Sequence, residues 1–136
     1  MENKKNKLKI LLSAAFPPIA WAALIYFLSS QPVLPGIEIH SFDFILKKTG
    51  HMFVYAVLYV LLYRSTVVVS NPDAFKIFSK HRNAFVFITP ILICLAYAIS
   101  DEIHQSFTPN RFPSARDVGY DMIGVWIAYL KVYKYI

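Results

Sequence analysis

The sequence predicts an all-α, polytopic membrane protein: a bundle of four transmembrane helices whose N- and C-termini are both cytoplasmic. Of the 136 residues, 57% are hydrophobic and only 16% are charged, and the mean hydropathy is +0.46. Soluble domains carry about 25% charged residues, so this composition argues against a soluble globular protein. The charged residues are gathered between four apolar stretches, each close to the ~20 residues that a helix needs to cross a bilayer.

The length of the chain predicts one domain, residues 1–136. Its predicted spans cover about residues 10–29, 48–69, 84–103 and 115–135. The first span follows a run of lysines, as in a signal peptide, but it is too long for one and lacks a cleavage site of small residues. Pro17 and Pro18 near its middle predict a kink, which a membrane helix tolerates where neighbours satisfy the freed carbonyls.

The second and third spans contain few polar residues. The second includes Arg64, whose long side chain can reach the nearer interface. The third carries Pro90 and the single cysteine, Cys94, which we expect to be a buried apolar side chain. Between the spans, we expect residues 30–47 to be irregular, because they hold two prolines and a glycine, and residues 71–83 to form a short interfacial helix.

The distribution of charge predicts the orientation. With a cytoplasmic N-terminus, the inner segments hold 10 basic and 2 acidic residues, whereas the outer segments hold 4 basic and 6 acidic residues. The net charges are therefore +8 inside and −2 outside, in agreement with the positive-inside rule. The basic residues flank apolar runs and form no stripe on one surface, so the net charge of +6 does not indicate a nucleic-acid partner.

This topology places most of the unusual polar residues on the outer side of the membrane. Helical spacing groups them, because residues three, four or seven positions apart share a helix face. The groups are Lys48, His51 and Tyr55 on the second span, Asp101, Glu102, His104 and Gln105 on the third, and Asp117, Asp121 and Gly124 on the fourth, with Arg111 in the preceding loop. We expect these helix ends to converge on one hydrogen-bonded polar pocket, with Glu102 at its centre.

Several of these residues also have purely structural interpretations. Asp121 is the hardest to explain in this way, because a carboxylate about one turn inside the apolar region costs up to ~3 kcal/mol. The structural alternatives are a capping box formed by Ser114 and Asp117, close helix packing at Gly124, and an interfacial ion pair between Glu102 and Arg111.

One segment resembles the signature of a known family. Residues 100–111 read Ser-Asp-Glu-Ile-His-Gln-Ser-Phe-Thr-Pro-Asn-Arg and are followed by Asp117 and Gly124. Further matches are Ser29-Ser30-Gln31-Pro32 after the first span and Lys48-x-x-His51-x-x-x-Tyr55 at the start of the second. Together these residues resemble the VanZ-like family of small bacterial membrane proteins. The family usually has Gly at the position of Asn110 and often Asn at the position of Asp121.

The resemblance implies a multi-pass protein of the bacterial cytoplasmic membrane that acts in the cell envelope. The founding member of the family is associated with low-level resistance to the lipoglycopeptide teicoplanin, by a route that does not rebuild the peptidoglycan terminus. We therefore predict that the outer polar cluster binds an envelope lipid, a lipid-linked intermediate or a lipoglycopeptide, with membrane lipids around the helices. The predicted binding residues are Lys48, Tyr55, Asp101, Gln105, Arg111 and Asp121.

A membrane-embedded enzyme acting on a lipid-linked or phosphate-bearing envelope substrate is the second hypothesis. Its base or nucleophile and their acid-base partners would come from His51, His104, Glu102 and Asp117, with Lys48 and Arg111 as an anion clamp. A metal site is a third hypothesis, but Asp-Glu-x-His lacks the two-histidine spacing of a helical zinc motif. We accordingly predict no metal and no cofactor, and the sequence indicates no particular oligomeric state.

Overall fold

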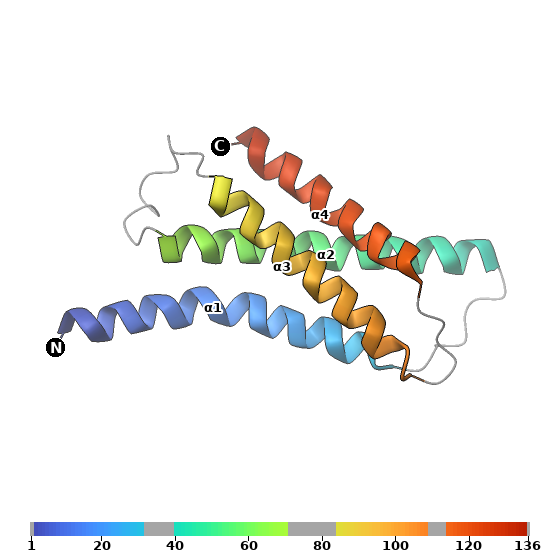
Figure 1. Cartoon of the computed structure of the whole chain (residues 1–136), viewed down its shortest axis with the longest axis horizontal. Helices are drawn as coiled ribbons and strands as arrows, with labels where there is room; N and C mark the ends of the chain where they lie inside the picture. Colours follow the sequence, from blue (N-terminus) through green and yellow to red (C-terminus); the bar gives the residue numbers. More distant parts are fainter. Residues whose placement is uncertain (1, 32–39, 71–83, 109–113, 136) are drawn as a thin grey trace.

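The computed structural model describes residues 2–31, 40–70, 84–108 and 114–135. In these ranges the chain forms four helices and no strand: α1 (Glu2–Ser29), α2 (His40–Ser70), α3 (Ala84–Gln105) and α4 (Ala115–Tyr135). Successive helices run in opposite directions, so the two chain termini lie at the same end of the bundle (Figure 1). The all-α prediction is therefore confirmed.

Three of the described helices are long and apolar enough to cross a membrane. These segments are Leu8–Ser29, Ile45–Ser70 and Ala84–Gln105, with mean hydropathies of 1.8, 1.8 and 2.0. The 21 residues of α4 correspond to about 31 Å of helix, enough to cross the hydrocarbon core, but five of them are charged. Membrane crossing by α4 and the cytoplasmic placement of the termini therefore stay predictions.

The predicted loop before the second span is wrong over residues 40–47, because α2 begins at His40. The helix-breaking residues of this stretch all lie at or before Gly36, so nothing prevents the helix from extending beyond the apolar run. A span predicted from hydropathy locates the apolar part of a helix and not the residue at which the helix begins. The interfacial helix predicted for residues 71–83 lies outside the described residues.

The first helix runs without interruption through Pro17 and Pro18. Figure 1 shows it bent along its length, in line with the predicted kink, because each proline removes one hydrogen bond of the helical ladder. Two side chains tie α1 to its neighbours through backbone carbonyls. Trp21 Nε1 donates to the Val54 carbonyl at 2.9 Å, and the Tyr97 hydroxyl donates to the Ala22 carbonyl at 2.6 Å.

The core lies along α2 and α3, with α1 and α4 on opposite sides of this pair. Within the described residues, α2 packs most extensively against α4, α1 and α3 barely touch, and α1 and α4 do not meet. The buried side chains include Tyr55, Leu58, Tyr59, Cys94 and Val125, so the expected burial of the cysteine is confirmed. Large apolar residues such as Phe16, Phe53 and Phe85 are exposed instead, as in a helix bundle that faces lipid.

Close contact between α2 and α4 depends on Gly124. A Cβ atom at this position would overlap the Met52 carbonyl and its neighbouring backbone atoms. The packing role of Gly124 is therefore confirmed: the backbones of the two helices approach more closely than any side chain at residue 124 permits.

A Gly124→Ala substitution should force α4 away from α2. We expect a loss of about 1–3 kcal/mol, typical of overpacking, measured as lower thermal stability of the protein in detergent. Gly119→Ala on the same helix is the matched control, since a Cβ there meets nothing within 4 Å, and it should leave stability unchanged or slightly higher. Equal stability of both variants would contradict the close approach.

The charge distribution predicts the sidedness of the bundle. A reporter fused after Tyr135 should behave as cytoplasmic, and one inserted near Gly36 as external. Finding the segment around Phe78 outside the cell would overturn this orientation.

Candidate functional site

Most of the sequence-predicted site residues lie at one end of the bundle, where α1 and α3 finish and α2 and α4 begin (Figure 1). We call this the polar end. Four carboxylates from α3 and α4 are gathered here, and we refer to them as the acidic cluster: Asp101, Glu102, Asp117 and Asp121. Each of the four has a different kind of hydrogen-bonding partner.

Asp117 in the first turn of α4 forms an ion pair with Lys48 of α2. The two side chains are only 22% and 18% exposed, so this pair is shielded from water far more than an ordinary surface salt bridge. The Lys48 ammonium also lies 5.4 Å from the centre of the Tyr120 ring, in cation–π range. Lys48 is thereby held between α2 and α4.

Asp121 lies one turn further into α4 and contacts His51. Asp121 Oδ1 and His51 Nδ1 are 3.2 Å apart, and the Asp121 side chain is almost completely buried. A proton on Nδ1 makes His51 the donor to the carboxylate. Lys48 and His51 on α2 are three residues apart and Asp117 and Asp121 on α4 are four apart, so each helix contributes two side chains about one turn apart to the same interface.

The two carboxylates of α3 are buried and bonded to neutral donors. Gln105 Nε2 donates to Asp101 Oδ2 at 2.9 Å, one turn away on the same helix. The backbone N–H of Ser114 donates to Glu102 Oε2 at 2.9 Å. Glu102 therefore connects the end of α3 to the start of α4.

Ser114 caps α4 in part as the sequence predicts. Its hydroxyl oxygen accepts the backbone N–H of Arg116 at 3.3 Å. In a capping box, the acidic residue three positions on would reach back to the Ser114 N–H. Glu102 bonds to that N–H instead, and the Asp117 carboxylate pairs with Lys48. The structural interpretation of Asp117 as a capping residue is therefore replaced by an interhelical ion pair.

Several buried oxygen atoms at and below the polar end lack a hydrogen-bond partner. Among the side chains that the structure describes, these are Ser29 Oγ, Tyr55 Oη, Tyr59 Oη, Glu102 Oε1 and Asp121 Oδ2. The charges of Asp101 and Asp121 both act on the Tyr55 hydroxyl and on Glu102. Glu102 Oε1 and Asp121 Oδ2 are therefore buried acceptors without donors, and the Tyr55 hydroxyl is a buried donor without an acceptor.

His104 lies apart from the acidic cluster, on the seam between α1 and α3. Its Nε2 is 3.0 Å from Ser30 Oγ, and its ring centre is 4.4 Å from that of Tyr26. The Ser30 hydroxyl already donates to the Tyr26 carbonyl at 2.7 Å. Ser30 therefore accepts the hydrogen bond from His104, and this serine–histidine pair is not arranged as a nucleophile with its base.

The other predictions for the site have mixed outcomes. Tyr55 is fully buried, with its ring centre 6.2 Å from that of Tyr97, so it lies beneath the acidic cluster. Arg111, and with it the predicted Glu102–Arg111 pair, lies outside the described residues. Within the described ranges, no three His, Cys, Asp or Glu side chains are placed to hold a metal ion. Ser30 was noted in the sequence only as part of the family-like Ser29-Ser30-Gln31-Pro32 segment and not as a partner of His104, and Tyr120 was missed because nothing in its spacing distinguishes it.

The Lys48–Asp117 pair can be tested by a double-mutant cycle. Lys48→Met and Asp117→Asn should each destabilise the protein, because each removes the ion-pair partner of one partly buried charge. The double variant should lose less than the sum, with a coupling of about 0.5–3 kcal/mol in thermal unfolding. Combining Asp117→Asn with Lys131→Gln, at the far end of α4, should be additive. Equal coupling in both cycles would argue against the pair.

Comparison with known proteins agrees with the resemblance noted in the sequence. A family model described as VanZ/LLP1 matches residues 14–135. This match includes most of α1, all of α2, α3 and α4, and every residue of the acidic cluster. No curated protein and no solved structure matches the chain. The chain belongs to the VanZ/LLP1 family of membrane proteins.

Proposed function

We propose that the acidic cluster binds the polar headgroup of an envelope lipid or of a lipid-linked envelope intermediate. The observation that carries this proposal is the pair of buried carboxylate oxygens without a donor, Glu102 Oε1 and Asp121 Oδ2. A buried acceptor left unsatisfied costs about 1–3 kcal/mol, and more when it is charged. A ligand that donates hydrogen bonds to both oxygens would recover this free energy.

The charges at the site indicate which ligands fit. The charges of the other three carboxylates of the acidic cluster all act on Glu102, and the Lys48 ammonium is already paired with Asp117. A phosphate would be repelled by this arrangement, whereas hydroxyl or ammonium groups would donate to Glu102 and Asp121. We therefore favour a headgroup with sugar hydroxyls or an amine over the anion that Lys48 and Arg111 were expected to clamp.

A lipoglycopeptide of the teicoplanin class fits the same chemistry, because it combines sugar hydroxyls with a hydrocarbon chain. Binding of such an antibiotic at the acidic cluster would account for low-level resistance by sequestration, with no change to the peptidoglycan. Teicoplanin is therefore one of the ligands in the binding experiment described below.

His51 supports a catalytic role as the second candidate function. Asp121 holds its Nδ1, which leaves Nε2 to accept a proton, as in a histidine base oriented by a carboxylate. The substrate would be the same lipid-linked molecule. His51→Asn should then abolish turnover while preserving binding, because Asn keeps a donor for Asp121.

The proposal is tested by lipid binding to the purified protein, measured by native mass spectrometry. The ligands are a glycosyl diacylglycerol, phosphatidylethanolamine, phosphatidic acid and teicoplanin. Glu102→Gln and Asp121→Asn should each weaken binding of the sugar- or amine-bearing ligands about tenfold, equivalent to ~1.4 kcal/mol, the scale of a hydrogen bond to a charged group.

Ser106→Ala is the matched control, because Ser106 is exposed at the polar end and bonds to the Ile103 carbonyl in the last turn of α3. It should bind all ligands like the parent protein. Preferential binding of phosphatidic acid, or equal binding by Glu102→Gln, Asp121→Asn and the parent, would overturn the proposal.

A further inference from the structure

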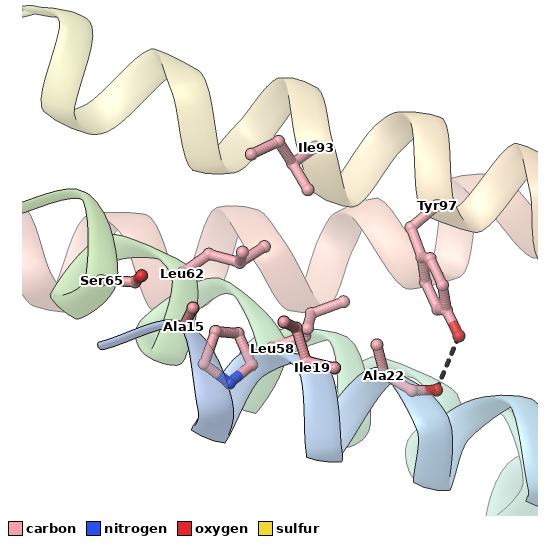
Figure 2. A pocket seen from close by; sticks show the side chains of 9 residues that line it. Ala15, Ile19, Ala22, Leu58, Leu62, Ser65, Ile93 and Tyr97 are labelled. Atoms are coloured by element: carbon pink, nitrogen blue, oxygen red, sulfur yellow. Dashed lines mark hydrogen bonds between the residues drawn. The ribbon is translucent and has the colours of Figure 1, made fainter. Parts of the chain in front are cut away.

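A second feature of the bundle lies away from the acidic cluster, between α1, α2 and α3. It is an apolar groove with a cavity volume of about 280 Å³. Its lining residues are Ala15, Pro18, Ile19, Ala22, Leu58, Leu62, Ser65, Ile93 and Tyr97 (Figure 2). The small side chains of Ala15 and Ala22 leave this space where larger residues would fill it.

The groove contains little that water could bind. Tyr97 is one of two polar residues in the lining, and its hydroxyl is already bonded to the Ala22 carbonyl at 2.6 Å (Figure 2). Ordered water in a buried site needs two to four polar partners. The groove is therefore suited to an apolar occupant.

The groove lies at mid-membrane depth and is open toward lipid. Its residues on α1 are centred on the apolar segment Leu8–Ser29, and Ala15 and Ala22 each lie about 10 Å from the nearer end of that segment. Ile19 and Ile93 flank it on α1 and α3, with 65% and 44% of their surfaces exposed. Since α1 and α3 barely touch, the opening is between them.

The size of the groove selects among apolar occupants. A helix with its side chains is about 10–12 Å wide, too wide for this space. An apolar cavity of roughly 150 Å³ holds a ring of six carbon atoms, so a groove of about 280 Å³ accommodates a stretch of one hydrocarbon chain. We infer that this groove is a binding site for the hydrocarbon chain of a membrane lipid, separate from the headgroup site proposed above.

The position of the polar end indicates that the hydrocarbon chain comes from the leaflet on that side of the membrane. Along the same α1–α3 seam, Ser30 lies about 12 Å beyond Ala22, where it is bonded to His104. A lipid whose polar group contacts this pair must reach about 12 Å into the membrane before its chain enters the groove. Long-chain lipids satisfy this requirement, and short-chain lipids do not.

Photocrosslinking tests the site in the intact protein. A long-chain phospholipid carrying a diazirine near the end of one chain is reconstituted with the parent protein, and labelled residues are mapped by mass spectrometry. We expect labelling concentrated at least fivefold on Ile19 and Ile93 relative to the lipid-exposed Phe16. Excess unlabelled long-chain lipid should compete, whereas excess dihexanoyl lipid should not.

Variants on α1 provide the matched comparison. Ala15→Phe fills the groove and should reduce labelling of Ile93 at least fivefold. Ala23→Phe adds the same bulk on an exposed position of the same helix and should leave labelling unchanged. Even labelling of Ile19, Ile93 and Phe16, or crosslinks between two protein chains at Ile19 and Ile93, would overturn the inference. If Ala15→Phe does not fold, the parent map and the lipid competition still decide between these outcomes.

Discussion

The polar end depends on one constraint, the close approach of α2 and α4 where Gly124 meets the Met52 backbone. This contact brings the two helices near enough for the short aspartate side chains of α4, one and two turns further out, to reach residues of α2. His51 can then reach Asp121, and Lys48 can reach Asp117. A glycine that exposes only backbone therefore determines the geometry of the Lys48–Asp117 and His51–Asp121 pairs.

A second connection, through Glu102, holds the end of α3 against the start of α4. Its carboxylate accepts a hydrogen bond from the Ser114 N–H, one of the N-terminal donors that have no partner within α4. The partial positive charge at a helix start also favours a carboxylate there. Glu102 thus has one oxygen that bonds to the start of α4 and one buried oxygen without a hydrogen-bond partner.

Much of this arrangement follows from residue spacing. The intervals of three residues from Lys48 to His51 and four residues from Asp117 to Asp121 each keep two polar side chains on one helix face, and the structure brings these two groups together. His104 could not be placed in this way. It is one turn from Asp101, but its direction depends on which helix packs on which side of α3, and spacing within one helix carries no such information. The start of α2 was missed for another physical reason, because hydropathy reports the lipid boundary and not helix formation.

The hydrogen bonds that attach α1 to α2 and α3 affect which of its residues can be substituted. Trp21 and Tyr97 both donate to carbonyl oxygens of the main chain, at Val54 and Ala22. Every residue type carries that acceptor, so the partner positions can mutate without loss of the bond, whereas the two donors cannot. Over evolutionary time, the lipid-facing surface of this helix is free to drift with membrane composition while its attachment to the bundle stays the same.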